Sequence, residues 1–514
     1  MIENLVIGSG PVGIAAAWKV TLLGSSCTMI DAGEEIELHK QKLVEALAAK
    51  NISEWNRGDK ETYQNLTKSE SRLKTHVGSK LLFGSSFPYA EYRSLGDDKV
   101  LVNSQVNIYP SLASGGLANV WGSICLPYAQ SDAQHLRVKP RKEDYDFIDD
   151  FMPIAARRDG LSEIYSMPSQ IQDPVSASNF GNRLRSKFPL IEKSLPFNVH
   201  GGSPRVAVYT QGSNKCQSCG LCATGCVWGS IWDAKREILE LKKNENFSYF
   251  KGFRVNQIIK HNGHYEVKGI DGAIIFARRI FLAAGPIGTT IVLQKSELIP
   301  KQVFFSDTQL TIVPCLIFGR RQTDNNFVLS QYLLNFPFEK VGGGTDCFVQ
   351  ITGYNPDLTR RIRGYFSFTK YVPKFILEVF FRYLGIAMIF QNSNTSGQVR
   401  ITNENGTIHI STVTNSEENI LHLGVFKNIK RVLKKLNMLP LTFLSQVVGV
   451  GESYHIGKMT SCEGKLILNS LGEISGIDKL HVIDTCALDH IAPGPITYTA
   501  MANAVRIVED VLKK

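Results

Sequence analysis

Four cysteines crowd into one short stretch of this 514-residue chain, at Cys216, Cys219, Cys222 and Cys226. Their spacing is that of ferredoxin-like cluster ligation, and thiolates bind both iron–sulfur clusters and zinc. The proline that often follows the last ligand is Val227 here, and no second run of cysteines exists. The segment predicts an iron–sulfur cluster, with a structural zinc site as the alternative and reduced or paired thiols as a third interpretation.

A glycine-rich turn near the start of the chain has the pattern of a dinucleotide-binding motif. Gly8, Gly10 and Gly13 stand between a strand-like and a helix-like run, and Asp31 closes the next strand-like run. The first glycine permits the bend, the second lets a pyrophosphate approach the backbone, and the third lets helix pack on strand. Asp31 is expected to bind ribose hydroxyls. The motif alone does not choose FAD over NAD.

The elements that position these residues begin with a βαβ unit. We predict strands at Leu5–Gly8 and Cys27–Asp31 with a helix at Ile14–Thr21 between them. Further along, Val255–Gly285 predicts three strands joined by turns at Asn262-Gly263 and Asp271-Gly272. A parallel sheet with an added hairpin is therefore expected.

The second half of the chain predicts a separate sheet domain. Short β-type runs fill Gln309–Ile410, and Asn419–Asn437 has the stripe of a basic amphipathic helix. Phe375–Phe390 is apolar on several sides but carries Glu378 and Arg382, and it is shorter than a membrane span. We predict a helix there, in the core or beside a substrate tunnel, with an interfacial helix touching lipid as the alternative.

The composition is that of an ordinary globular protein with two to four structural units, at roughly 150 residues per domain. Hydrophobic residues at 43% and charged residues at 20% exclude disorder, collagen and extended coiled coil. The net charge of +10 is spread along the chain, so no nucleic-acid partner is expected. The chain starts without a basic leader or signal core, so we expect a cytoplasmic protein, or one peripheral to the inner face of the membrane.

Three further segments resemble the glucose-methanol-choline (GMC) oxidoreductase family. They are, in the family's order, Ser114–Gly122 (SGGLANVWG), Leu282–Thr290 (LAAGPIGTT) and the C-terminal run His481–Leu512. The cysteine segment resembles one found in a subset of the same family. The resemblance implies FAD on an N-terminal Rossmann domain. The cofactor-binding residues that it implies, besides the glycine turn and Asp31, are Gly115, Gly116, Asn119, Asp484 and Thr497. Some relatives tether flavin through a histidine where this chain has Val120, so a covalent bond at that position is excluded.

The resemblance also implies a catalytic base. His455, in ESYHIG, matches the histidine that accepts the hydroxyl proton as hydride leaves for flavin N5. Where relatives carry Asn or His before a proline, this chain has Pro493-Gly494-Pro495, so the second polar partner of the alcohol is missing. Either His490, Tyr454, Tyr498 or Lys458 substitutes for it, or the pocket accepts a bulkier substrate.

These observations define the expected fold and function. The fold class is α/β, an FAD-binding Rossmann-type domain interleaved with a mainly antiparallel-sheet substrate domain. The expected segments are 1–35, 100–130, 205–295 and 450–514 for the FAD domain, 36–99 and 131–204 as insertions, and 296–449 for the substrate domain. The expected activity is an FAD-dependent dehydrogenase acting on a CH–OH group.

The substrate and the electron acceptor are less defined. A sugar-like alcohol comes first and a lipidic alcohol second, with a protein or a quinone as the electron acceptor. Two alternatives stay open, namely a catalytically decayed flavoprotein and a flavin/iron–sulfur electron-transfer subunit.

Overall fold

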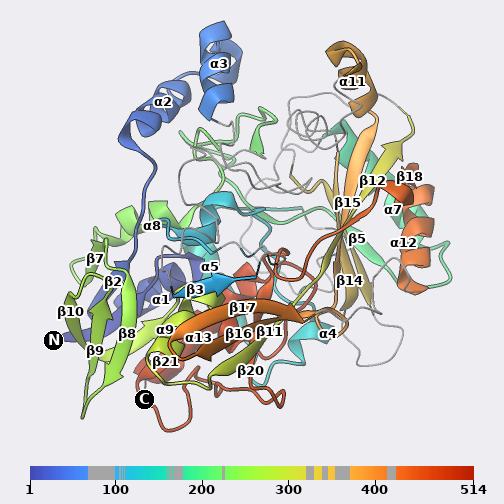
Figure 1. Ribbon diagram of the computed structural model, residues 1–514. Coiled ribbons are helices and arrows are strands. Elements are labelled where there is room, and N and C mark those ends of the chain that lie inside the picture. Colours follow the sequence, from blue (N-terminus) through green and yellow to red (C-terminus); the bar gives the residue numbers. More distant parts are fainter. Residues whose placement is uncertain are drawn as a thin grey trace.

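The chain folds as a mixed α/β protein built around three large sheets. The computed structural model describes residues 1–66, 99–103, 106, 108, 110–157, 159, 161, 165, 178–222, 226–319, 329–337, 345–353, 371–413 and 424–513. In Figure 1 the first sheet lies on the left and the third on the right, with the second sheet between them at the bottom. The fold-class prediction is confirmed.

The first sheet is parallel at its centre and carries a hairpin at one side. Its strands in spatial order are β7 (Phe247–Lys251), β2 (Cys27–Asp31), β1 (Ile2–Ile7), β10 (Ile274–Leu282), β9 (Tyr265–Gly269) and β8 (Val255–Lys260), with β21 (Leu480–Val482) also beside β10. Leu5 and Ile7 face one hydrophobic core and Val6 faces another, so β1 is buried on both sides. A parallel sheet covered on both faces explains this unbroken apolar run.

The predicted βαβ start and the predicted hairpin are both confirmed. Strand β1 pairs in parallel with β2 and with β10, while β8, β9 and β10 pair antiparallel. Gly263 and Gly272 adopt positive φ in the two predicted turns, with values of 83° and 85°. Helix α1 (Pro11–Leu22) begins three residues before the predicted Ile14, because proline is favoured at the first helical position.

Two antiparallel sheets form the rest of the β structure. The second sheet consists of β20 (Ile456–Thr460), β11 (Gln302–Asp307), β16 (Gln398–Glu404), β17 (Thr407–Val413) and β3 (Val100–Val102), the last of which pairs in parallel. The third consists of β18 (Met438–Pro440), β12 (Leu310–Ile317), β15 (Leu384–Gln391), β14 (Thr345–Thr352), β13 (Tyr332–Pro337) and β5 (His200–Gly202), with β19 (Gln446–Val447) also paired to β12. A small pair is formed by β4 (Ile154–Ala155) and β6 (Val206–Ala207).

The helices cover these sheets. The remaining described helices are α2 (Leu38–Ala48), α3 (Arg57–Leu66), α4 (Gln130–Ala133), α5 (Lys142–Phe151), α7 (Asn179–Glu192), α8 (Ala234–Leu241), α9 (Gly285–Lys295), α11 (Lys374–Phe381), α12 (Gly424–Lys435) and α13 (Thr497–Leu512). Short 3₁₀ helices lie at η1 (Ile52–Glu54), η3 (Gly116–Val120), η7 (Thr442–Leu444) and η8 (Thr485–Ala487). Helices α1 and α13 share one core beneath the first sheet. Within the described residues, no helix is both long enough and apolar enough to span a bilayer.

The single helix predicted over Phe375–Phe390 is wrong. Helix α11 ends at Phe381, and β15 then pairs with β12 on one side and β14 on the other. Successive residues of β15 face opposite cores, with Ile389 on one side and Phe390 on the other. A central strand that is buried on both faces is as apolar as a buried helix, so the hydrophobic pattern could not separate the two. Phe380 is 50% exposed on α11, and lipid contact there stays a prediction.

The predicted basic helix before Asn437 exists as α12. Its Phe426, Ile429, Val432 and Leu433 are buried against the third sheet, so packing is the role of its apolar stripe. The predicted start at Asn419 lies outside the described residues.

Candidate active site

The glycine turn after β1 is shaped by two close backbone approaches. Gly8 has φ of +104°, and a Cβ there would lie 2.4 Å from the carbonyl oxygen of Ala283. A Cβ on Gly13 would lie 2.0 Å from the carbonyl oxygen of Gly8. Neither position can hold a side chain, so both glycines are required by the protein's own packing.

Gly10 differs from its two neighbours. Its φ of −63° and ψ of 175° are open to any residue, and a Cβ there would meet nothing within 4 Å. Gly10 also stands at the N-cap of α1, whose first N–H groups receive no side-chain cap. An open space in front of an uncapped helix N-terminus fits an incoming phosphate, so the residues present fit a bound dinucleotide.

Asp31 is held at the end of β2 by a serine that the motif did not single out. The Ser9 hydroxyl donates to the Asp31 carboxylate and accepts the Gly115 N–H at 2.9 Å. Burial raises the pKa of Asp31 to about 7, although these hydrogen bonds act in the opposite direction. Ser9 therefore joins the dinucleotide turn to the second glycine loop.

The raised pKa of Asp31 predicts pH-dependent cofactor binding. Ribose hydroxyls donate best to an ionised carboxylate, so a bound dinucleotide should favour the ionised form. Because the pKa of Asp31 is raised to about 7, dinucleotide affinity should fall by up to about tenfold per pH unit below that pH. Titration of apoprotein with FAD from pH 5.5 to 8.5 measures this dependence. Asp31→Asn should bind more weakly with a flat profile, and an equally steep profile in that variant would contradict the assignment.

The second glycine loop packs directly against the first. Gly115 has φ of +84°, and a Cβ there would lie 2.8 Å from the Lys235 backbone nitrogen. A Cβ on Gly116 would lie 3.3 Å from the Cα of Gly10. The Asn119 amide donates to the carbonyls of Ser114 and Gly116 at 2.9 and 2.8 Å, so it fixes the turn. The structure thus brings Gly10, Gly115, Gly116 and Asn119 together.

Asp484 and Thr497 lie at the starts of two helices in the C-terminal run, η8 and α13. The Asp484 carboxylate accepts the Thr289 hydroxyl at 2.5 Å and the Cys486 N–H at 3.0 Å, so it ties η8 to α9. Burial raises the pKa of Asp484. Thr497 opens α13, whose N-terminus has no side-chain cap.

His455 lies just before β20, with its ring stacked on Phe390 of β15. The ring centroids are 4.8 Å apart at 23°, and burial lowers the pKa of His455 to about 4. Its buried Nδ1 has no hydrogen-bond partner among the described residues. A neutral imidazole with an unpartnered nitrogen can accept a proton from a bound hydroxyl.

A buried carboxylate shapes the turn that presents His455. Asp307, at the end of β11, accepts the Ser453 hydroxyl and the Gly451 N–H, the latter at 2.9 Å. The Ser453 hydroxyl in turn accepts the His455 N–H at 2.9 Å. Tyr454 adopts a φ of +64°, so the turn is tight at this point. Asp307 therefore positions His455 through the backbone.

One hydrophobic cluster joins the parts of the candidate site. Phe348 and Phe390 are cross-strand neighbours on β14 and β15, and Trp121 at the end of the second glycine loop packs against the same cluster. A Cβ on Gly494 would lie 3.9 Å from Phe348. His455 and Gly494 therefore lie beside two neighbouring aromatic rings, and Trp121 of the glycine loop packs against the hydrophobic cluster to which these rings belong.

His490 lies in different surroundings. Its buried Nε2 lies 3.4 Å from a carboxylate oxygen of Asp132 but, like Nδ1 of His455, makes no hydrogen bond among the described residues, and its ring is 5.1 Å from that of His135. The Tyr128 hydroxyl donates to the backbone carbonyl of His490 at 3.1 Å. These contacts give His490 a packing role of its own, and its catalytic role stays a prediction.

The cysteine segment does not form the predicted metal site. Among the residues that the structure describes, no group of three or more His, Cys, Asp or Glu side chains could hold a metal ion, so neither the iron–sulfur cluster nor zinc is supported. Cys216, Cys222 and Cys226 instead contact the hydrophobic cluster around Phe390. Burial raises the pKa of Cys216, and that of Cys219 to about 12, and the neighbouring Cys226 acts in the same direction on both.

The cysteine segment is also covered from outside. Trp228 stacks on Trp55 with centroids 5.4 Å apart and donates to the carbonyl of Lys50 at 3.0 Å. Helices α2 and α3 thereby pack over the loop, which lies between them and the candidate site.

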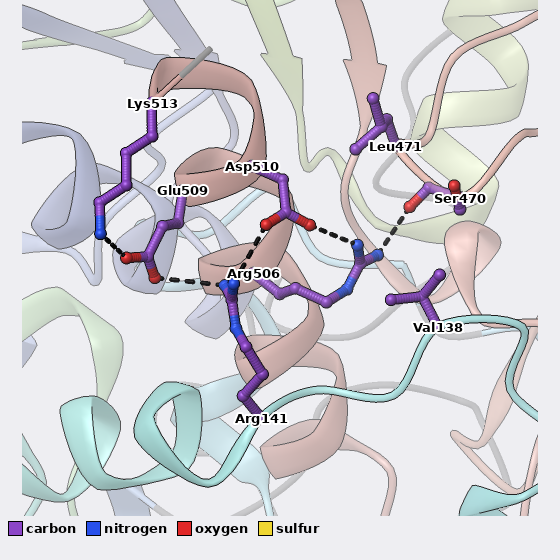
Figure 2. A pocket seen from close by; sticks show the side chains of 8 residues that line it. All are labelled: Val138, Arg141, Ser470, Leu471, Arg506, Glu509, Asp510 and Lys513. Atoms are coloured by element: carbon purple, nitrogen blue, oxygen red, sulfur yellow. Dashed lines mark hydrogen bonds and ion pairs between the residues drawn. The ribbon is translucent and has the colours of Figure 1, made fainter.

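A separate surface pocket of about 460 Å³ lies at the end of α13 (Figure 2). Its charged side chains neutralise one another, as shown by Arg141 to Glu509 at 3.2 Å and Arg506 to Asp510 at 3.0 Å. Although burial acts in the opposite direction, hydrogen bonds and charge pairing with Lys513 and Lys19 lower the pKa of Glu509 to about 2. The side chains that line the pocket form an ion-pair network that holds α13 to α5. None of them belongs to the candidate site.

The fold and the site define a class of protein. In this class an α/β sheet of the dinucleotide-binding type is joined to an antiparallel sheet, and a histidine lies beside an aromatic cluster. The same fold occurs in pyridoxine 4-oxidase from Mesorbium loti, with a TM-score of 0.59, 12% sequence identity and 100% of both chains covered. At this identity the likeness shows the fold alone. No family of known proteins matches the sequence, and no curated protein matches it either.

Sequence reasoning missed several residues of the site. Ser9, Asp307, Phe348 and Phe390 carry no motif of their own, although Ser9 stands inside the glycine turn. Asp307 and the two phenylalanines come from strands far from His455 in the chain, so only the fold brings them together.

Proposed function

We propose that this protein is an FAD-dependent oxidoreductase that acts on a CH–OH group. The observation that carries the proposal is that Trp121, at the end of the second glycine loop, packs against the same hydrophobic cluster as Phe390, on which the His455 ring stacks. A dinucleotide cradle alone would also fit a nicotinamide protein. The additional histidine and the resemblance to the GMC family favour flavin chemistry at an alcohol.

The residues that would hold FAD come from both glycine loops and the C-terminal run. Gly10 leaves room for the pyrophosphate, Asp31 would bind the ribose, and Gly115 and Gly116 would lie against the rest of the cofactor. Val120 leaves that position without a tethering side chain, so we expect FAD to be non-covalent there. When bound, FAD supplies the acceptor for the hydride of the alcohol.

His455 would take the hydroxyl proton. Its lowered pKa keeps the imidazole neutral at ordinary pH, so a ring nitrogen can accept the proton as the C–H bond breaks. Phe390 fixes one face of the ring, and the Ser453–Asp307 contact fixes its backbone. The neighbour of the same fold is by name a pyridoxine 4-oxidase, so this fold is compatible with the proposed oxidoreductase.

The visible spectrum of purified protein tests the proposal. Flavin bands that disappear anaerobically on addition of an alcohol, and supernatant colour after acid precipitation, are expected. A bound nicotinamide, or bound flavin that no alcohol in a broad panel of sugars, aliphatic alcohols and aromatic alcohols reduces, would contradict the proposal. The electron acceptor, a protein or a quinone, stays a prediction.

A further inference from the structure

We propose that the space beside Gly494 is a subsite for an apolar, preferably aromatic, substituent of the alcohol. This inference rests on the proposed function and names its substrate class. It makes Gly494 a specificity-determining residue and places an aromatic alcohol ahead of a sugar.

Gly494 is required neither by the backbone nor by packing. Its φ is not among the positive values of the chain, so a side chain would be tolerated by the backbone. It is buried, yet a Cβ there would meet only Phe348 at 3.9 Å, which is an ordinary contact distance. Gly10 likewise has no positive φ and has room for a Cβ, and the open space beside Gly10 fits a ligand. The same reasoning assigns the space beside Gly494 to a group of a ligand.

The neighbours of this space that the contacts identify are aromatic and uncharged. Phe348 is the side chain nearest to a Cβ at Gly494, and the His455 ring stacks on its cross-strand partner Phe390. Phe348 and Phe390 belong to a row of paired residues that crosses four strands of the third sheet, Asn335, Phe348, Phe390 and Leu310. The neighbouring row on the same face of the sheet consists of Leu333, Gln350, Met388 and Ile312.

The polar groups of these rows are engaged with the protein. The Asn335 amide donates to the Tyr165 hydroxyl at 2.8 Å, and the Gln350 amide oxygen accepts the Ser330 hydroxyl at 3.0 Å. A sugar placed against Phe348 and Phe390 would therefore lose hydrogen bonds to water without replacing them, which is costly. An apolar group there would instead be stabilised by burial and ring contact.

The experiment compares three probes on the flavin-loaded protein, namely benzyl alcohol, 1-propanol and glucose. Dissociation constants from calorimetry, and the alcohol concentrations that give half the maximal rate of anaerobic flavin reduction, are measured for the parent and for Gly494→Leu. The parent should bind benzyl alcohol more tightly than glucose. Gly494→Leu should weaken the binding of benzyl alcohol by roughly tenfold to hundredfold, which is the range for losing the burial of one apolar group. The same substitution should change the affinity for 1-propanol by less than about threefold.

Gly424→Leu is the matched control. Gly424 is exposed at the start of α12, also lacks a positive φ, and has open space around its Cβ, so all three probes should bind as to the parent. If Gly494→Leu fails to fold, Gly494→Ala and Phe348→Leu should each weaken benzyl alcohol more than 1-propanol.

Two outcomes would overturn the subsite. One is tighter binding of glucose than of benzyl alcohol, and the other is equal weakening, or none, of both alcohols in the Gly494 variants. The proposed function fails differently, when benzyl alcohol binds as expected but no alcohol reduces the flavin.

Discussion

His455→Ala is expected to slow flavin reduction by the alcohol by roughly a hundredfold to ten-thousandfold, the range that a positioned acid–base group supplies. The substitution should affect the reaction and not the fold. The His455 ring only stacks on Phe390, and the hydrogen bond to Ser453 comes from the backbone N–H of residue 455, which alanine keeps. FAD content and thermal unfolding should therefore stay close to the parent. Stopped-flow reduction at saturating alcohol, with absorbance and circular dichroism on the same samples, measures both.

The pH profile provides an independent check on His455. Because burial lowers its pKa to about 4, the imidazole is neutral above that pH, and the rate of reduction per bound flavin should fall only as the pH drops toward 4. A decline centred near 6.5 would show that His455 titrates as an exposed histidine or that another group is the base. His490→Ala is the control. Parental rates in His455→Ala would exclude it as the base, and a slow His490→Ala alone would move the role to His490.

Gly10→Val is expected to remove FAD from a folded protein. The backbone at Gly10 suits any residue and the space around it is open, so valine should fit the apoprotein. The same side chain would occupy the position of the pyrophosphate, and the overpacking of that contact should weaken FAD by roughly tenfold to hundredfold or more. Flavin absorbance per protein and calorimetric titration of apoprotein with FAD measure the change.

Gly13→Val is the matched comparison for Gly10→Val, because the same side chain is introduced in the same turn but points into the protein's own backbone. A Cβ there would lie 2.0 Å from the Gly8 carbonyl oxygen, so this variant should lose both fold and flavin. Full FAD binding by Gly10→Val would show that no phosphate lies in front of α1. Equal thermal destabilisation by the two substitutions would show that Gly10 serves the protein and not a ligand.

The sequence predicted the parts whose information is local. The turn Gly8–Gly13 with the strands on either side, and the hairpin turns at Gly263 and Gly272, depend on neighbouring residues only. The parts that failed depend on distant partners. Leu384–Gln391 became a strand because β12 and β14 flank it.

The candidate site divides in the same way. His455 and the glycine loops could be named from the chain because each stands in a recognisable short segment. The aromatic pair Phe348 and Phe390 could not, since cross-strand register decides which apolar residues face the site. The cysteine spacing predicted a metal, but spacing does not state where thiols point, and the fold turns three of them toward an apolar cluster.

The first sheet joins the two ends of the chain, and this has a consequence for biosynthesis. Strand β1 pairs with β10, β10 pairs with β21, and α1 packs with α13, so the core beneath the glycine turn is complete only when the last residues are made. At translation rates of roughly 5 to 20 residues per second, the apolar β1 waits on the order of tens of seconds for its partner β10. Such distant pairings also slow folding after release, and truncation before Leu480 removes β21, one of the three strands beside β10.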